Sequence, residues 1–332
     1  MKKVFNLLLI AVLSILTAFS MVACSDQDFG GKDKKGISGS LVEECVYEIR
    51  HYYAEDGVTT LDIGALELPA GATEIRIKKN AFKDNTTLKS IIVPATVTEI
   101  EAGAFAKMHA LEVLEIPFVG RFANSDAYFK ESASAEKKAV DAERTIAHLF
   151  GTEEYDNGSS VTIKYGGTNG EGSTTCYIPV TLNKIIVNAG AEYSIPMYAF
   201  NGMVIGMIEL KGNIVAIGEK AFAGAGYANI TIPATVKTIY KNAFDGALVQ
   251  KVIFENNASD IVVMANAFVN CKNLRKVGVG EVDNNVIDLS VFKEIGKDAF
   301  NTANQIKYSV LNAGSFDLQN IFGEVYSNVT KA

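Results

Sequence analysis

Short alternating runs of aliphatic residues recur along the chain, and most of them are followed several positions later by the pair Ala-Phe. The phenylalanines of these pairs are Phe82, Phe105, Phe200, Phe222, Phe244, Phe268 and Phe300. They are separated by 23, 95, 22, 22, 24 and 32 residues, so the unit is about 22 to 24 residues long and two gaps are enlarged. A fixed period of this length predicts a solenoid, in which each unit buries its apolar face only against its neighbours.

The clearest copy of the unit runs from Leu88 to Phe105 and reads L-x-x-I-x-V-P-x-x-V-x-x-I-x-x-x-A-F. Its β-branched run predicts one short strand per repeat, with alternate residues pointing inward and outward. Each of the six prolines directly follows Leu, Val or Ile, where a strand is expected to stop because proline cannot donate to a ladder. Since phenylalanine returns to the same place in every turn, we expect the rings to stack in one column.

This pattern resembles the BspA-like, or type 5, leucine-rich repeat, and Cys271-Lys-Asn-Leu274 is similar to the C-x-x-L ending of that repeat. The resemblance covers roughly residues 60–312. It implies a β-rich leucine-rich-repeat solenoid with one short parallel strand per 22–24-residue repeat, plus a large inserted loop or hairpin. For some members of the family it also implies display at the cell surface and binding of proteins or host components.

The N-terminus combines Lys2 and Lys3, an apolar run from Val4 to about Val22, and small residues before Cys24. This arrangement is typical of a secretory signal peptide; the alternative is a transmembrane helix. Cys24 and the polar residues after it resemble a bacterial lipobox, which implies that Cys24 is acylated and anchors the protein in the outer membrane. The acidic stretch that follows resembles the export tags of surface-displayed lipoproteins in Bacteroides-like bacteria.

We expect five segments along the chain. They are a signal peptide at 1–23, a flexible tether at 24–39, a repeat domain at 40–312, an insertion within it at about 118–175, and a cap or tail at 313–332. The entry segment between Leu41 and Tyr53 has the spacing of a capping helix, but residues 46–52 alternate well enough for a strand. Within the insertion we expect a short helix near 132–150 and a hairpin whose strands flank Gly166–Gly172.

Charge and composition exclude several function classes. The chain has a net charge of −7; without residues 1–23 it has 29 basic and 38 acidic side chains, giving −9. This acidity argues against nucleic acid as a partner. The three histidines stand in unrelated contexts and no Cys or His pair has metal-ligand spacing, so we predict no metal, no cofactor and no enzymatic activity. The sequence leaves undecided whether Cys45 and Cys176 form a disulfide, and Cys271 is expected in the core.

Alternation along the strands places a series of side chains on the open face of the sheet. The outward positions are Ser90, Ile92, Val113, Glu115, Lys184, Ile186, Met207, Glu209, Asn229, Thr231, Lys251, Ile253 and Lys276. Five of them are apolar and are expected to be exposed, among charges of both signs. Such a stripe favours a protein ligand over a sugar, although β-propensity alone also accounts for aliphatic residues there.

The sequence therefore predicts a non-enzymatic, lipid-anchored and surface-exposed protein that binds extracellular or host proteins, as an adhesin or interaction module. Ligand contacts are expected from Ile92, Glu115, Lys184, Ile186, Met207, Glu209, Thr231, Lys251 and Ile253, and from the inserted loop. The alternative is a glycan-binding accessory lipoprotein with a polysaccharide ligand, which the absence of tryptophan disfavours. Contact with the membrane is expected only through the lipid on Cys24.

Overall fold

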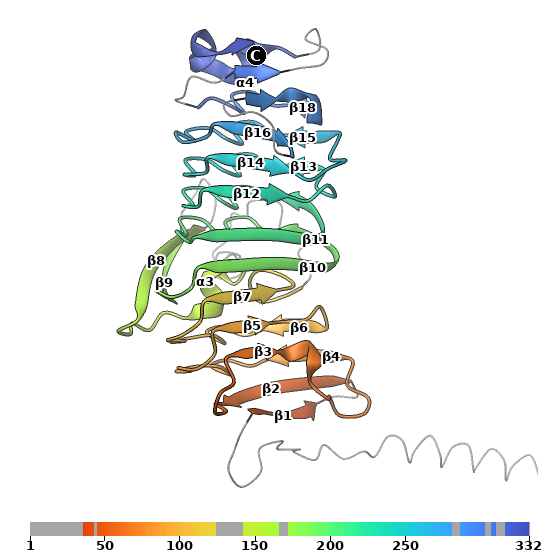
Figure 1. Cartoon of the computed structure of the whole chain (residues 1–332), viewed down its shortest axis with the longest axis vertical. Coiled ribbons are helices and arrows are strands. Elements are labelled where there is room, and N and C mark those ends of the chain that lie inside the picture. Colours follow the sequence, from red (N-terminus) through yellow and green to blue (C-terminus); the bar gives the residue numbers. More distant parts are fainter. Residues whose placement is uncertain are drawn as a thin grey trace, which may run out of the picture.

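The computed structural model shows a solenoid whose coils stack along one long axis (Figure 1). It describes residues 36–42, 45–123, 142–165, 172–280, 286–302, 307–309 and 316–331. Its strands form one four-stranded, one eight-stranded, one six-stranded and one two-stranded sheet. Apart from two antiparallel pairs, β1 with β2 and β8 with β9, the paired strands run parallel. The predicted β-rich repeat solenoid is confirmed.

One column of strands forms the open face, and its register follows the predicted alternation. Its members are β3 (Thr60–Asp62), β5 (Ser90–Ile92), β7 (Val113–Ile116), the first part of β10 (Lys184–Ile195) and of β11 (Met207–Ile217), β12 (Asn229–Ile232), β14 (Lys251–Phe254), β16 (Lys276–Val279), β17 (Val286–Asp288), β19 (Lys307–Ser309) and β20 (Thr330–Lys331). In β7, Leu114 and Ile116 point into the core while Val113 and Glu115 point outward.

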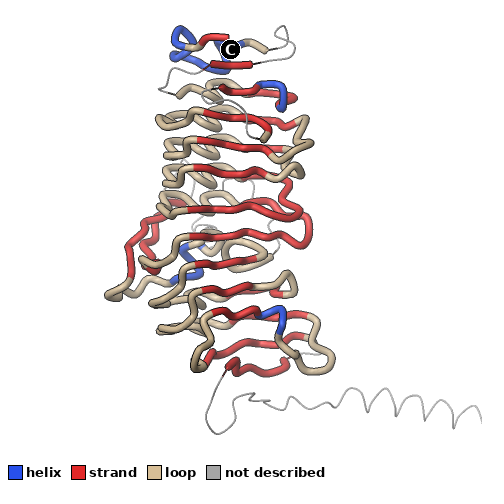
Figure 2. The backbone as a smooth tube through the Cα atoms, viewed as in Figure 1, coloured by secondary structure: helices blue, strands red, loops and turns tan. Residues whose placement is uncertain are grey.

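A second column of strands lies around the corner of each coil. Its members are β2 (Val46–Tyr53), β4 (Glu74–Ile77), β6 (Val97–Ile100), the last residues of β10 and β11, β13 (Thr238–Ile239), β15 (Ile261–Val263) and β18 (Phe292–Ile295). Most repeats therefore contain two short strands. The loops and turns gather along another edge of the stack, as Figure 2 shows.

Proline decides where a strand breaks at the corner between the two columns. Pro94, Pro117 and Pro233 end the first strand of their coils, because proline has no N–H to donate. In β10 and β11 the same slot holds Asn188 and Lys211, which are paired in register. Those two strands continue through the corner for 12 and 11 residues and join the two columns in one sheet.

The phenylalanines of the Ala-Phe pairs stack in the predicted column. Ring centroids are 5.3 Å apart for Phe82–Phe105, 5.2 Å for Phe200–Phe222, 5.1 Å for Phe222–Phe244, 4.8 Å for Phe244–Phe268 and 5.1 Å for Phe268–Phe300. The backbone fixes this register: the Phe222 amide donates to the carbonyl before the next ring, Ala243, at 2.8 Å. Stacked rings thus align one coil on the next.

The same backbone bond shows that the column is longer than the Ala-Phe pairs alone. Tyr52 donates to Ala81 at 2.8 Å, Phe105 donates to Leu149 at 2.9 Å, and Phe300 donates to Ile321 at 3.1 Å. Tyr52, Phe150 and Phe322 therefore occupy the phenylalanine position of their coils, although none of the three is preceded by alanine. The sequence pattern had recognised only the copies with Ala-Phe.

In six of the seven Ala-Phe turns, two positions have a positive φ, at two residues before and two residues after the phenylalanine. Around Phe244 these are Asn242 (φ 57°) and Gly246 (φ 66°). Glycine and asparagine adopt this backbone region at low cost, which is why they recur in these slots. Lys220 (φ 53°) and Tyr198 (φ 57°) adopt it without that advantage.

The 95-residue gap contains one further coil and a hairpin. Short helix α3 (Ala147–Phe150) fills the next phenylalanine slot, while Val140 of the predicted helix lies outside the described residues. β8 (Gly158–Tyr165) and β9 (Gly172–Pro179) form the expected antiparallel hairpin, whose tip is also outside them. The start of the excursion is tied to β10 because the Val119 amide donates to Tyr193 Oη at 2.9 Å.

The two ends of the stack use different elements. At the N-terminal end, β1 (Gly36–Val42) pairs with β2, so the entry segment is a strand and not the alternative helix. At the C-terminal end, α4 (Leu318–Phe322) and the 3-10 helix η4 (Gly323–Asn328) follow the last coils, and Phe322 is fully buried. Two further 3-10 turns, η1 (Ile63–Ala65) and η3 (Leu289–Val291), follow β3 and β17.

Candidate functional site

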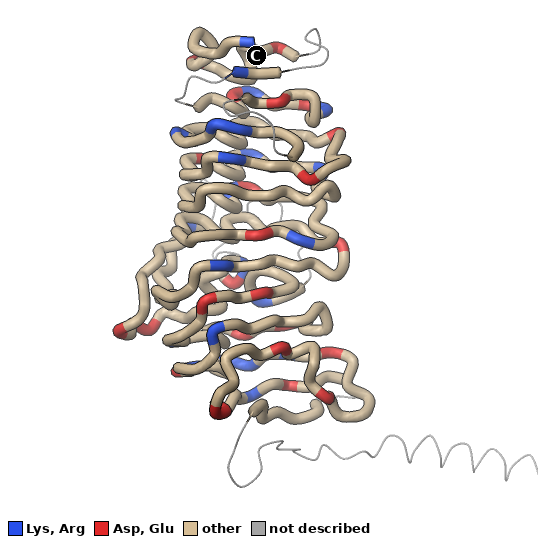
Figure 3. Tube along the Cα trace, in the orientation of Figure 1, with Lys and Arg blue, Asp and Glu red and all other residues tan. Residues whose placement is uncertain are grey.

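The open face carries an apolar strip at its centre, formed by Val204, Met207, Leu248 and Ile253. Val204 is 67% exposed, Leu248 50% and Met207 47%, which makes them among the most exposed large apolar residues described. Ile253 is half-buried on β14. Between β11 and β14 runs β12, whose outward residues Asn229 and Thr231 are exposed and uncharged. Figure 3 shows no charged residue along this strand.

The strip includes a ridge that the sequence analysis missed. Val204 and Gly226 form a parallel bridge, and the Leu248 amide donates to Ala225, so these positions succeed one another from coil to coil. Gly226 has no side chain, and a β-carbon there would lie 3.1 Å from Val204. The Val204 side chain therefore packs over Gly226, next to the coil that carries Leu248. The register of each strand, extended three residues upstream, would have found this ridge.

Two outward residues are buried, which corrects the sequence prediction. Ile186 is only 7% exposed because it lies between Glu115 and Glu209 in register. Asn188 Nδ2 donates to Glu115 Oε1 at 2.7 Å, and Lys184 pairs with Glu209 at 2.5 Å, so polar side chains surround it. Lys276 is 3% exposed and its ammonium donates to the Gly280 carbonyl at 2.7 Å. Ile186 is therefore not part of an exposed stripe.

The remaining predicted residues lie on the face as expected from the alternation. Ile92, Glu115, Lys184, Glu209, Lys251 and Ile253 are half-buried, while Met207 and Thr231 are exposed. Ile92 and Glu115 lie toward the N-terminal end of the face, apart from the strip. The face brings Met207, Thr231, Lys251 and Ile253 together on β11, β12 and β14.

A charged rim borders the strip on the side of β10. Glu209 accepts from Lys184 and also pairs with Lys211 at 3.2 Å. Partial burial opposes ionisation of Glu209, but the two ammonium groups outweigh it, so the pKa of this carboxyl lies below its usual range. The negative charge of Glu209 is thus neutralised within the rim, and its two lysine partners leave an excess of positive charge.

The described residues offer little to catalysis. Within them, no group of three or more His, Cys, Asp or Glu could hold a metal ion. His109 packs edge-on against Tyr155, with ring centroids 5.2 Å apart. Glu153 is held by Lys83 at 2.9 Å and Lys107 at 3.1 Å.

The three described cysteines are free thiols, so Cys45 and Cys176 form no disulfide here. Burial raises the pKa of the Cys176 thiol to about 12, which keeps it protonated and unreactive. Cys271 is buried as expected, and its thiol donates to the Phe244 carbonyl at 2.9 Å. Cys24 lies outside the described residues.

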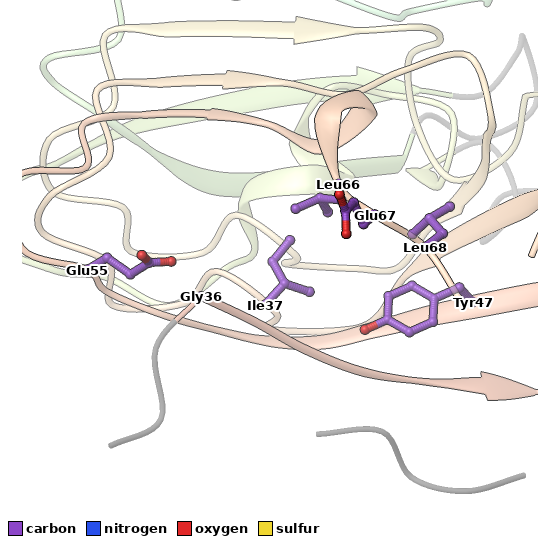
Figure 4. A pocket seen from close by; sticks show the side chains of 7 residues that line it. All are labelled: Gly36, Ile37, Tyr47, Glu55, Leu66, Glu67 and Leu68. Carbon is purple, nitrogen blue, oxygen red and sulfur yellow. The ribbon is translucent and has the colours of Figure 1, made fainter. Parts of the chain in front are cut away.

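A hollow of about 290 Å³ opens at the N-terminal end of the stack. Figure 4 shows Ile37 pointing toward Leu66, with Tyr47 and Leu68 beside them. Glu55 and Glu67 are the ionisable carboxyls among its lining residues, on different segments. The lining is mainly apolar and belongs to the end of the solenoid core.

The repeat pattern can now be assigned to a family. The chain matches the BspA type leucine-rich repeat region in six copies, over residues 59–137 and 193–331. The protein belongs to the BspA-type leucine-rich repeat family. The matched residues make up about two-thirds of the chain, and most of the excursion with the β8–β9 hairpin falls between the two matched segments.

Two solved structures are similar to this BspA-type chain. A leucine-rich repeat protein from Bacteroides ovatus is 15% identical, with 80% of this chain and 78% of that chain covered and a TM-score of 0.24. The pneumococcal vaccine antigen PcpA is 17% identical, with 86% and 72% covered and a TM-score of 0.26. No curated protein matches the chain. In the described part of this BspA-type protein, no helix is both long and apolar enough to cross a membrane.

Proposed function

We propose that this protein is a non-enzymatic binding protein of the cell surface whose ligand is an extracellular or host protein that docks on the apolar strip. The exposure of Met207 at the start of β11, and of Val204 and Leu248 in the turns that precede β11 and β14, is the observation that carries the proposal. Exposed apolar residues bordered by charge are typical of protein–protein interfaces, whose cores are depleted of charge and enriched in residues such as methionine. Membership of a leucine-rich repeat family supports an interaction module.

A polysaccharide ligand is the alternative, and the face itself favours protein. The outward positions of the face from Ser90 to Lys276 contain no aromatic side chain on which a sugar ring could stack. Aliphatic and thioether side chains gain binding energy from excluding water over a broad contact, as an opposing protein surface provides.

Substitution of Met207 by Asp tests the strip. A carboxylate in the middle of a desolvated contact is expected to weaken binding about 10- to 100-fold, since interface centres tolerate unpaired charge poorly. The measurement is surface plasmon resonance of the purified mature domain against a panel of extracellular-matrix proteins and polysaccharides.

Met264→Asp is the matched control, because Met264 is 36% exposed and follows β15 in the second strand column, away from the face. Equal binding by the Met207→Asp variant and the parent would remove the strip as the site and point to the hairpin. Specific binding of polysaccharide alone would overturn the protein ligand. Ile186→Asp is unsuitable here, since Ile186 is buried and its substitution tests folding.

We further propose that the lipid on Cys24 anchors the protein in the outer membrane with the solenoid facing outward. The apolar N-terminal run and the Cys24 context support this reading, and the polar residues between Cys24 and β1, which begins at Gly36, would serve as the tether. Protease treatment of intact cells is expected to remove the solenoid from wild-type cells. Full protection in intact cells, with cleavage after outer-membrane permeabilisation, would indicate a periplasmic protein.

A further inference from the structure

A second concave site lies on the turn edge of the solenoid, away from the open face. It is a cavity of about 250 Å³ where residues 142–153 of the excursion pack over the turns of Phe82 and Phe105. Its floor is formed by Gly103, Ala106, Ala147 and Gly151. The cavity exists because Gly103 occupies a slot two residues before the phenylalanine, where other coils carry a side chain such as Tyr198 or Lys220.

The residues of the floor are in ordinary van der Waals contact. The position of a β-carbon on Gly103 would lie 3.6 Å from Ala106 Cβ and 3.6 Å from Gly151 Cα. Gly103 and Gly151 both have positive φ, at 66° and 76°, so the turn conformation accounts for glycine at both positions. The result is a shallow apolar base of methyl and methylene groups.

Uncharged polar groups line the walls above this base. Among the described residues, no hydrogen bond engages the side chains of Asn80, Thr152 or Thr174. Asn80 Oδ1 lies 3.5 Å from the β-carbon position of Gly103, so the amide faces the base. His148 Nε2 lies 3.1 Å from the Ile100 carbonyl and must carry the proton there, which leaves Nδ1 as an acceptor.

Most of the charged groups at the rim are paired with one another, and the exposed Lys79 also lines the cavity. Glu143 is paired with Arg121 at 3.1 Å, and Glu153 is paired with both Lys83 and Lys107. Burial lowers the pKa of His148, so its ring is neutral near pH 7. A neutral ligand with several hydroxyls would meet both free donors and free acceptors without displacing any of these pairs.

We propose that this cavity binds one neutral sugar unit, either a free monosaccharide or the end of a longer glycan. The C–H face of the ring lies on the Ala and Gly floor, and its hydroxyls bond to Asn80, Thr152 and Thr174. The volume holds a single ring, since cavities for larger ligands begin at about 300 Å³. This site goes beyond the protein-binding function proposed for the face, and neither depends on the other.

Titration of the purified mature domain with single sugars tests the site. The probes are glucose, galactose, mannose, fucose and N-acetylglucosamine, with glucuronic and galacturonic acids as charged counterparts, followed by saturation-transfer NMR up to about 20 mM, since few contacts give weak binding. At least one neutral sugar is expected to saturate the cavity. Its binding is expected to fall about 2- to 10-fold in Asn80→Gly, which deletes the amide and tolerates the φ of 61°.

Ala102→Trp is the second variant, because Ala102 is exposed at the cavity and a large side chain there blocks entry without changing the core. It is expected to abolish binding. Asn266→Gly is the matched control, with the same slot and a φ of 59° in a distant coil, and is expected to bind like the parent. The proposal is overturned if no neutral sugar binds, if a uronic acid binds more tightly than its neutral counterpart, or if both cavity variants bind normally.

Discussion

The coils on the two sides of the excursion use the same repeat but hold their neighbours in register in different ways. In the second strand column, the outward position on the N-terminal side reads Glu48, Arg76 and Glu99 in successive, paired strands. On the C-terminal side the same position reads Ala216, Thr238, Val262 and Glu294. One half thus alternates charge from coil to coil, while the other is uncharged over three coils before Glu294.

Ion pairs accordingly cross between the N-terminal coils. Lys78 contacts both Glu48 and Glu101, which come from the coils on either side of it. Arg121 contacts Glu99 at 2.7 Å and Glu143 at 3.1 Å, and so ties the last of these coils to the excursion. These side chains are partly exposed, so each pair contributes modestly to stability and depends on salt and pH.

The C-terminal coils depend more on the aromatic column. From Phe200 to Phe300 neighbouring rings are within 4° to 13° of parallel, whereas Tyr52 and Phe82 are tilted by 30° and Phe82 and Phe105 by 25°. Regular stacking of buried rings is insensitive to pH. Coils built from one repeat sequence can therefore be aligned by charge at the surface or by shape in the core.

Phe222→Ala gives the largest expected effect and tests the core side of this comparison. Phe222 is fully buried and stacks on Phe200 and Phe244, so its loss leaves a cavity in the middle of the column. We expect a loss of about 3–5 kcal/mol in unfolding free energy. Because each coil contacts only its neighbours, hydrogen exchange should rise most in the adjacent C-terminal coils.

The control for that variant is Phe122→Ala, since Phe122 is 39% exposed and contacts Arg121 at its ring face, 4.7 Å from the centroid. Its truncation is expected to cost no more than about 1 kcal/mol. An unchanged denaturation midpoint for Phe222→Ala would show that the column does not align the C-terminal coils.

Much of this architecture could be predicted from the sequence, because the same short pattern recurs in many repeats and each copy supports the others. The spacing of Ala-Phe and the alternation around Pro94 placed the column and the face correctly. Tyr52, Phe150 and Phe322 were missed as column members, since their slots are defined by a backbone bond between coils and not by a sequence match.

The functional surface was less predictable for a related reason. Strand alternation separates inward from outward residues, but exposure also depends on the side chains of the adjacent strands. Ile186 is outward and yet buried by Glu115, Glu209 and their partners. The cavity floored by Gly103 and Gly151 joins residues about 48 positions apart, through an excursion whose path no periodicity specifies.

The smaller prediction concerns pH and the N-terminal coils. Partial burial raises the pKa of Glu101, but the Lys78 ammonium and the Lys79 amide, which donates at 2.9 Å, outweigh it and lower that pKa. A carboxyl whose pKa is lower in the folded state stabilises the fold fully above its unfolded pKa of about 4.3. That stabilisation is lost as the pH falls through the folded value.

We therefore expect acidification from about pH 6 to below about pH 4 to increase hydrogen exchange earlier in the N-terminal coils than between Phe200 and Phe300. Glu101→Gln should remove part of that pH dependence and cost about 0.5–1 kcal/mol near pH 7, because the pair with Lys78 is partly exposed. Glu112→Gln is the control, since Glu112 and Lys89 are both about half exposed and their pair is expected to contribute less. Acid lability that begins in the C-terminal coils, or that is unchanged in Glu101→Gln, would mean that charge does not hold the N-terminal coils in register.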